Sequence, residues 1–551
     1  MSSYFSYIDD EEYGALPQYS GLYKAKIYPG LWDPLKENPY VGLYFRDKEM
    51  LIKGIGEWAI SNNVHLKVYI SNKTQYDVRC KLRKQDKNTK EDLPGTCLWR
   101  LRATYNIAAR MFKVTRYEGP HTCTFPTIPK YHPQLTSTVI ARCIENSISV
   151  NPLMRIPDVQ SFILGVYKKQ ISYKRAWMGK QKAIAASFGD WDESYKTLPK
   201  FMAAIRAENP GSYVNYKSLA PTDEGAVLKR VFFTFGPLVH AFIHCKPVIT
   251  IDATFLFGKY KEKLLIAMAS DADNHILPIA FAFCDEESAA NWSYFLRKLK
   301  DHVIKGRKEG MCLISDRHQG ILAAVRKEWD HVPGYVHRYC ARHFLENFKN
   351  EKDHQGKVLH QLAYDVIWEH QEKKYLHLMT KIFELNPQAH IWLTGVRTEK
   401  WACCYDGGRR YGAMTSNMAE IFNNVLRAAR VMPITACVQL IFYKVVAWFK
   451  RRRVHVQNMM MDRTPFGKNI QEIISSRQMD AGHYVMTYNG TDGIYSVTTG
   501  NYRNRGGNVH VIRAKEELCD CGKWTAMHIP CSHYFAVTRE LRLDWFQSII
   551  N

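Results

Sequence analysis

The N-terminal quarter of the chain alternates apolar and polar residues over short stretches, which is the pattern of half-buried β-strands. Val64 to Ile70 follows this period of two, and Trp99 to Ala103 repeats it. Residues 135–230 are predicted to be mainly helical. Residues 1–45 are rich in Tyr, Pro and Gly without periodicity, which indicates a disordered or loosely packed tail.

The pattern changes near residue 240, where apolar runs joined by turns precede runs that alternate with amphipathic segments. Three strands are predicted first, at 247–257, 263–269 and 276–284. The elements predicted after them are a helix at 288–299, a strand at 311–314, a helix at 318–328, a strand at 335–339 and another helix. The resulting order, β-β-β-α-β-α-β-α, predicts an α/β fold of the ribonuclease-H-like type.

Three acidic residues fall where such a core would bring carboxylates together. Asp252 ends the first predicted strand of the core, Asp316 ends the fourth, and Glu420 begins a helix within 415–455. Parallel neighbouring strands would place both aspartates at one edge of the sheet, and the helix would add the third carboxylate. Carboxylates are the ligands that hold two Mg²⁺ or Mn²⁺ ions for phosphodiester transfer.

Each of these residues also has a structural explanation when it is considered alone. An aspartate that follows a strand and precedes a helix, as Asp316 does, commonly caps the helix. Glu420 lies three residues after Asn417 and fits the second half of a capping box. The order of the three residues on the predicted topology favours the catalytic interpretation.

Cysteines and histidines form two groups with the spacing of metal ligands. The C-terminal group has two close pairs separated by nine residues, and it consists of Cys519, Cys521, Cys531 and His533. The N-terminal group is more widely spaced, and it consists of Cys80, Cys97, His121 and Cys123. Sulfur and imidazole ligands in such sets are typical of structural, tetrahedral Zn²⁺ sites, so Zn²⁺ is expected in both.

The formal net charge of +23 favours a polyanionic partner, and double-stranded DNA is the partner that we expect. Residues 61–130 alone hold 14 Lys and Arg against 5 Asp and Glu. The DNA contacts predicted in this region are Arg79, Lys81, Arg83, Lys84, Arg100, Arg102, Lys113 and Arg116, with Lys87 between them. A solvated basic face is the alternative for these residues, and also for the helical stretch 172–187.

The composition excludes several other classes of protein. Hydrophobic residues make up 46% of the 551 residues, enough to bury the cores of about three to four domains. No apolar run is long enough to cross a bilayer, and the acidic N-terminus does not resemble a signal peptide. We therefore expect an intracellular protein. The nucleus is the location that we expect for a protein that binds DNA. The basic run 450–453 is a candidate DNA contact or nuclear localisation signal.

Several blocks of the predicted core resemble the Mutator-like (MULE) transposase domain, which is known from plants. They lie at 250–260, 291–295, 314–321 and 415–424. The resemblance implies that Asp252, Asp316 and Glu420 are the metal-binding catalytic carboxylates. Cys340 and His343 are similar to a Cys-x-x-His signature that this family carries before its glutamate. They are candidates for shaping the active site or binding DNA, and a packed cysteine beside a helix-start histidine is the alternative.

The two Cys/His groups extend the resemblance to both sides of the core. Residues 97–123 resemble a WRKY–GCM-type zinc finger, in which a basic β-sheet enters the major groove, and residues 519–533 resemble a SWIM zinc finger. The implied division is a tail at 1–45, a DNA-binding zinc finger at 46–132, a helical DNA-binding or linker region at 133–240, a catalytic core at 241–455 with an all-α insertion at about 345–410, a connecting region at 456–507 and a SWIM finger at 508–545.

Two functions follow from this resemblance. The first is a cut-and-paste transposase that binds terminal inverted repeats and target DNA as a homo-oligomer, with no membrane or small-molecule partner. The second is a domesticated relative that regulates transcription by binding DNA without transposition. The intact triad favours the first, whereas the 18 residues that follow His533 (551 − 533) and the absence of a recognisable domain ahead of the finger leave room for the second.

Overall fold

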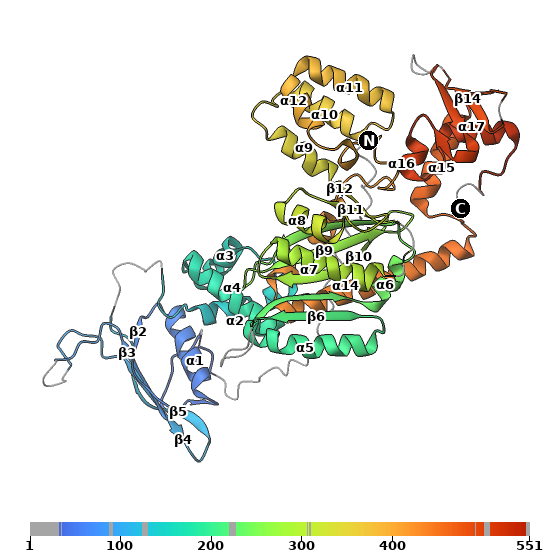
Figure 1. The fold of residues 1–551 in the computed structure, drawn as a ribbon. Helices are drawn as coiled ribbons and strands as arrows, with labels where there is room; N and C mark the ends of the chain where they lie inside the picture. Colours follow the sequence, from blue (N-terminus) through green and yellow to red (C-terminus); the bar gives the residue numbers. More distant parts are fainter. Residues whose placement is uncertain are drawn as a thin grey trace. The chain divides into compact units, whose positions relative to one another are not determined.

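The computed structural model describes residues 32–34, 36–86, 92–123, 131–219, 227–305, 307, 310–490, 492–500 and 507–546 (Figure 1). Most of the predicted tail, and Lys87, lie outside these described residues. The chain forms two compact units: Met1–Ser194 with Val431–Ala436, and Tyr195–Arg430 with Cys437–Asn551. No described helix is both long and apolar enough to cross a membrane.

The first unit begins with an antiparallel sheet in the order β1-β5-β4-β3-β2. Its elements are β1 (Tyr44–Phe45), α1 (Lys48–Ser61), β2 (Leu66–Ser71), β3 (Gln75–Cys80), β4 (Arg100–Asn106) and β5 (Met111–Glu118). Val78, Leu101 and Val114 lie on one sheet face and share a hydrophobic core with Trp58 of α1. The neighbouring polar residues lie on the other face, because side chains alternate along a strand. The strands predicted from the alternation near residues 64 and 99 are confirmed as β2 and β4.

Helices complete the first unit. They are α2 (Ser137–Val150), α3 (Ile156–Tyr167), α4 (Tyr173–Phe188) and the start of α5 (Trp191–Glu208). The side chains of Ile140, Ile144 and Ile184 are buried between them. A Cβ atom at Gly179 of α4 would lie 2.4 Å from the Ile140 side chain, so glycine is what permits the close approach of α2 and α4.

The second unit is built on a seven-stranded sheet in the order β12-β11-β8-β9-β10-β7-β6. The strands are β6 (Tyr213–Ser218), β7 (Leu228–Thr234), β8 (Val248–Phe255), β9 (Lys263–Ser270), β10 (Ile276–Cys284), β11 (Cys312–Ser315) and β12 (Val336–Tyr339). The strands β8, β11 and β12 run parallel, and the other neighbours are antiparallel. All five strands predicted for the core are confirmed. The helical prediction for 135–230 is wrong at β6 and β7, which extend this sheet at its far edge.

Helices lie between and after these strands. They are α6 (Gly236–Phe242), α7 (Ala289–Leu299), the π-helical turn η2 (Lys300–Ile304), α8 (Gln319–Glu328), α13 (Asn417–Val425) and the short turn η4 (Ala429–Val431). Further helices lie between β12 and α13, where the helical insertion is predicted, and Figure 1 shows these helices as one group beside β11 and β12. Its members are α9 (Ala341–Lys349), α10 (Lys357–Trp368), α11 (Glu372–Leu385), α12 (Pro387–Thr394) and η3 (Thr398–Lys400).

The C-terminal part follows the long helix α14 (Ile434–Met461) and contains a four-stranded antiparallel sheet in the order β13-β14-β15-β16. Its elements are α15 (Lys468–Ala481), β13 (Val485–Tyr488), β14 (Ile494–Thr498), β15 (Val509–Arg513), η5 (Ala514–Glu516), β16 (Leu518–Cys519), α16 (Lys523–Met527) and α17 (Ser532–Leu541). The segment 456–507, expected only to connect two domains, supplies α15, β13 and β14 to this module. The helices α16 and α17 follow the last strand of this module.

Candidate catalytic and zinc-binding sites

The register of the parallel strands places the two predicted catalytic aspartates level with each other. Ile314 of β11 pairs with Thr250 of β8, and the same offset of 64 residues (314 − 250) relates Asp316 to Asp252. Both residues are partly exposed, whereas the residues immediately before them on the strands are buried. The same sheet edge therefore carries both carboxylates.

The third acidic residue reaches this edge from α13, which packs against β8 and β9. Asn423, three residues after Glu420 on this helix, donates a hydrogen bond from Nδ2 to Oδ2 of Asp252 over 2.8 Å. The Glu420 carboxylate lies 2.6 Å from Nη1 of Arg342 and 3.7 Å from Nε2 of His343. These contacts, rather than a capping bond to the start of α13, occupy the Glu420 side chain.

The electrostatics of Asp252 reflect its two acidic neighbours. Burial is the main cause that raises the pKa of Asp252 to about 7, and the negative charges of Asp316 and Glu420 act in the same direction. Asp316 also accepts a hydrogen bond from the amide of His318 over 3.0 Å, which is a local turn contact with the residue before α8 and not a side-chain cap of that helix. Mutual repulsion among carboxylates at one site is what a bound divalent cation relieves, and oxygen donors fit Mg²⁺ or Mn²⁺.

Cys340 and His343 connect this edge to α13. Tyr339 pairs with Ser315, so Cys340 follows β12 at the level of Asp316. The Cys340 thiol is fully buried and accepts a hydrogen bond from the amide of Ser416, next to the start of α13, over 3.2 Å. Burial would raise the pKa of this thiol, but its hydrogen bonds with His343 and Ser416 lower it to about 7. The hydrogen bond with Cys340 is the main cause that raises the pKa of His343 to about 9.

In the structure, the ligand atoms of each predicted Cys/His group lie close together. Within the described parts of the chain, these two are the only groups in which at least three Cys, His, Asp or Glu ligand atoms lie within 4.8 Å of one another. The three predicted catalytic carboxylates, Asp252, Asp316 and Glu420, are therefore more widely spaced than the zinc-type ligands. Cys340 and His343 belong to neither group.

In the N-terminal group, His121 turns its Nδ1 atom toward the sulfur atoms. This nitrogen lies 3.3 Å from the sulfur of Cys97 and 3.5 Å from that of Cys123. The sulfur of Cys80 lies 3.6 Å from that of Cys123. Burial lowers the pKa of His121 to about 4, and its ring stacks on Trp99 with centroids 4.7 Å apart. A neutral imidazole beside three thiols is a donor set that fits Zn²⁺.

The C-terminal group is buried at all four positions. Nδ1 of His533 lies 3.5 Å from the sulfur of Cys519. Hydrogen bonds with the thiols of Cys521 and Cys531 raise the pKa of Cys519, and hydrogen bonds with the thiols of Cys519 and Cys531 lower that of Cys521. Three thiols and an imidazole that are all buried and close together are a donor set that fits a structural Zn²⁺ ion.

The stretch of sequence that contains β8, β11 and β12 matches a known protein domain. Residues 248–347 match the MULE transposase domain. This match includes Asp252, Asp316, Cys340 and His343, and it ends before Glu420.

Curated relatives agree with the match to the MULE transposase domain. The chain is 28% identical over 108 residues to the transposase for insertion sequence element IS256 in transposon Tn4001 of Staphylococcus aureus, which covers 18% of this chain and 26% of the relative. The same values hold for the corresponding transposase of Enterococcus faecalis. The chain thus spans about a quarter of the length of these relatives. Both comparisons support a transposase.

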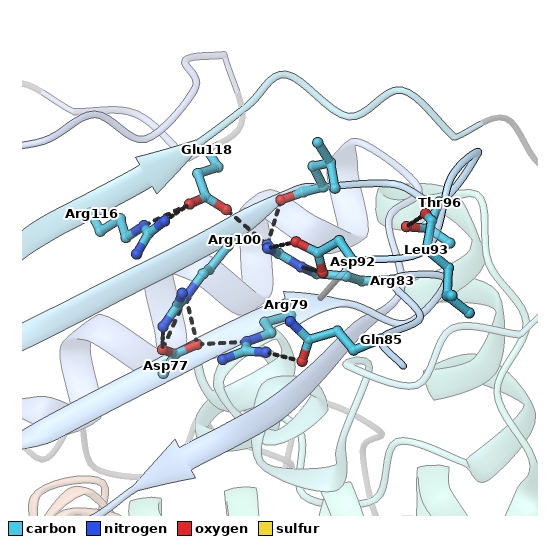
Figure 2. A network of polar contacts seen from close by, with 11 residues as sticks. Asp77, Arg79, Arg83, Gln85, Asp92, Leu93, Thr96, Arg100, Arg116 and Glu118 are labelled. Carbon is cyan, nitrogen blue, oxygen red and sulfur yellow. Dashed lines mark hydrogen bonds and ion pairs between the residues drawn. The ribbon is translucent and has the colours of Figure 1, made fainter. Parts of the chain in front are cut away.

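Three of the arginines that are predicted to contact DNA from the sheet of the first unit are ion-paired and largely buried. Asp77 is fully buried and accepts hydrogen bonds from the guanidinium groups of Arg79 and Arg100 (Figure 2). Arg83 pairs with Asp92 over 2.6 Å and with Glu118 over 2.8 Å. The side chains of Arg79, Arg83 and Arg100 are only 12%, 7% and 13% exposed.

The other predicted DNA contacts have different surroundings. Arg116 is 55% exposed and pairs with Glu118. Lys81 and Lys84 are exposed, whereas Arg102 and Lys113 are half-buried. In the predicted basic run at 450–453, Arg452 donates to the carbonyl of Ile276 over 2.7 Å, so this cation helps to fix α14 on the core.

Sequence reasoning missed three residues that contact or organise these sites. Arg342 and Asn423 hold Glu420 and Asp252, and Asp77 pairs with two arginines. Asn423 had a usable signal, because residues three apart on a helix lie on the same face and Glu420 is three residues earlier. Arg342 had no signal in the sequence, because its partner Glu420 is distant along the chain. Asp77 had a partial signal in Arg79, two residues away on the same face of β3, but its other partner, Arg100, lies on β4.

Proposed function

We propose that the protein is a Mutator-like DNA transposase with a ribonuclease-H-like core and an Asp-Asp-Glu active site. The observation that carries the proposal is the level alignment of Asp252 and Asp316 on parallel strands, with α13 bringing Glu420 beside them. The match of residues 248–347 to the MULE transposase domain supports the same assignment.

In this proposal Asp252, Asp316 and Glu420 would hold Mg²⁺ or Mn²⁺, and the bound ion would supply Lewis-acid chemistry to the phosphodiester and to the attacking oxygen. Water attacks the phosphorus at the element end, and the broken P–O bond leaves a 3′-hydroxyl. That hydroxyl then attacks a phosphodiester of target DNA and displaces its 3′-oxygen. Asn423 orients the carboxylate of Asp252, and Arg342 holds Glu420 until DNA enters.

The N-terminal zinc module is proposed to bind the terminal inverted repeats through its basic sheet, with a homo-oligomer pairing the two ends. The C-terminal module is proposed to be a SWIM-type zinc finger. We also propose a nuclear location, which imaging of a fluorescently tagged full-length protein tests.

The decisive experiment measures strand cleavage and joining on DNA that carries the cognate terminal repeats, with Mg²⁺ or Mn²⁺. Asp252→Asn, Asp316→Asn and Glu420→Gln should each abolish both steps while DNA binding is retained. Glu286→Gln, an exposed acid on the same unit, is the matched control and should leave activity unchanged. Specific DNA binding by a wild-type protein that neither cleaves nor joins DNA would instead favour the domesticated regulator.

A further inference from the structure

The segment that leads into the catalytic helix α13 is held by a buried ionic clamp. Asp406 and Arg410 are 4% and 1% exposed, and Arg338 of β12 is 8% exposed. The Asp406 carboxylate accepts hydrogen bonds from Nε of Arg338 over 2.7 Å and from Nε of Arg410 over 3.2 Å. This clamp fixes residues 406–412, here called the clamp loop, against the end of β12.

The clamp loop is linked directly to the position of Glu420. Arg410 donates from Nη1 to the carbonyls of Tyr339 and Met414 over 3.2 and 3.3 Å. The Met414 carbonyl also accepts from the amide of Ala341, the first residue of α9, over 2.8 Å. Two residues later, the amide of Ser416 donates to Cys340. A displacement of the clamp loop would therefore move the start of α13, which carries Glu420.

The other side of the clamp loop is covered by the C-terminal zinc module. Nε2 of His528 donates a hydrogen bond to the carbonyl of Gly408 over 2.9 Å, because a carbonyl oxygen can only accept. The His528 ring stacks on Tyr411 with centroids 3.8 Å apart and planes 13° from parallel. Gly408 has a φ of +74°, and a Cβ there would lie 2.4 Å from the carbonyl oxygen of Thr525. The fit between the two surfaces is therefore close enough to exclude a side chain.

The covering residues lie between the zinc-type ligands. Residues 522–530, here called the docking segment, join Cys521 to Cys531 and contain α16. A second close approach occurs at the start of the segment, where a Cβ at Gly522 would lie 2.1 Å from the carbonyl oxygen of His370 in the helical insertion. Because both ends of the docking segment are anchored at ligands, the metal site determines its conformation.

We propose that the C-terminal zinc module positions Glu420, with His528 as the positioning residue that acts through the clamp loop. The path runs from His528 to Gly408 and Tyr411, through the Asp406–Arg410 clamp, to Met414 and Ser416. The module thus acts on the catalytic edge of its own chain, and this role needs no DNA contact. The effect on catalysis rests on the proposed function. The structural coupling between His528 and the start of α13 does not depend on it.

The test uses the full-length protein and His528→Ala, which removes the hydrogen bond and the stacked ring without removing a zinc-type ligand. Amide hydrogen exchange over residues 413–424 should become faster, and Mn²⁺ binding measured by electron paramagnetic resonance should weaken about tenfold, as is usual for residues that support metal ligands. Zinc content and DNA affinity should stay at the wild-type values. Tyr488→Ala, on the edge strand β13 at the other side of the module's sheet, is the control and should change none of these quantities.

A second variant approaches the same contact from the catalytic side. Tyr411→Leu should accelerate exchange over 413–424 in the same way, and it decides the question if His528→Ala does not fold. Unchanged exchange over 413–424 in a folded, zinc-loaded variant would overturn the proposal, and so would weaker DNA binding with unaltered Mn²⁺ affinity. If the wild type shows no Mn²⁺ site that Asp252→Asn removes, the transposase proposal fails, and the exchange measurement alone decides the coupling.

Discussion

Replacing Asp77 by asparagine should destabilise the N-terminal sheet more than any change to its surface ion pairs. The Asp77 side chain is 0% exposed, and it lies 3.3 Å from Nε of Arg79 and 3.1 Å from Nε of Arg100. Both guanidinium groups are themselves largely buried, at 12% and 13% exposure. Asparagine keeps the shape of the side chain but leaves two buried cations without their counter-charge.

Breaking a buried pair by removing one partner costs about 3–5 kcal/mol. The lower end of that range applies to Asp77→Asn, because Arg79 keeps two other partners. It donates from Nη1 to Oε1 of Gln85 over 2.9 Å, and its guanidinium carbon lies 3.5 Å from the centroid of the Tyr69 ring. Arg100 is the more strongly affected cation, because it makes the shorter and more numerous contacts with Asp77.

The assay is hydrogen exchange of peptides from β3 and β4 in the full-length protein as the urea concentration is raised. Asp77→Asn should lower the free energy of unfolding of these strands by about 3 kcal/mol. Arg116→Gln, at the 55% exposed partner of Glu118, is the control and should change it by at most about 1 kcal/mol. Equal effects of the two variants would refute the reasoning, because they would show that the buried carboxylate does not hold the strands together.

Three further outcomes are expected. Asn423→Ala, which removes the hydrogen bond to Asp252, should weaken Mn²⁺ binding about tenfold in a titration while zinc content is unchanged. Full-length protein should contain one zinc ion for each Cys/His group by elemental analysis, and Cys97→Ser or Cys531→Ser should each remove one. Burial lowers the pKa of His337 to about 3, so below about pH 6.5 the unfolded chain binds a proton at this residue and the folded chain does not. The free energy of unfolding of the second unit should therefore fall as the pH drops from 6.5 toward 3. His337→Gln should flatten this part of the profile when the urea midpoint is measured against pH.

The proposed catalytic edge could be predicted from the sequence as far as local patterns reach. Asp252 and Asp316 each end an apolar run, and parallel strands put such ends on one edge. The sequence could not supply the register, which depends on how Thr250 and Ile314 pair across the sheet. Glu420 lies 104 residues beyond Asp316 (420 − 316), past the whole helical insertion. The predicted order of elements made Glu420 a plausible third carboxylate, and the resemblance to a known family made that assignment specific.

The strands β6 and β7 show where periodicity fails. Val231, Phe232 and Phe233 of β7 are all fully buried, so the strand carries no alternation that would separate it from a buried helix. Together with β6 it follows four helices, and the sequence pattern therefore groups both strands with these helices. Its place in the sheet is set by pairing with β10, a contact between segments about 50 residues apart, which local sequence cannot reveal.

The charge of the N-terminal module shows a different limit. A net count of +9 over residues 61–130 (14 − 5) treats every cation as available, whereas the fold pairs Arg79 and Arg100 with the buried Asp77 and pairs Arg83 with Asp92 and Glu118. These side chains are at most 13% exposed and are held by acids, so they are less available to a phosphate than exposed cations are. DNA binding by this sheet would therefore depend on cations such as Lys81 and Lys84, which remain exposed. The buried arginines would contribute by keeping the sheet, and the cysteines at its end, in place.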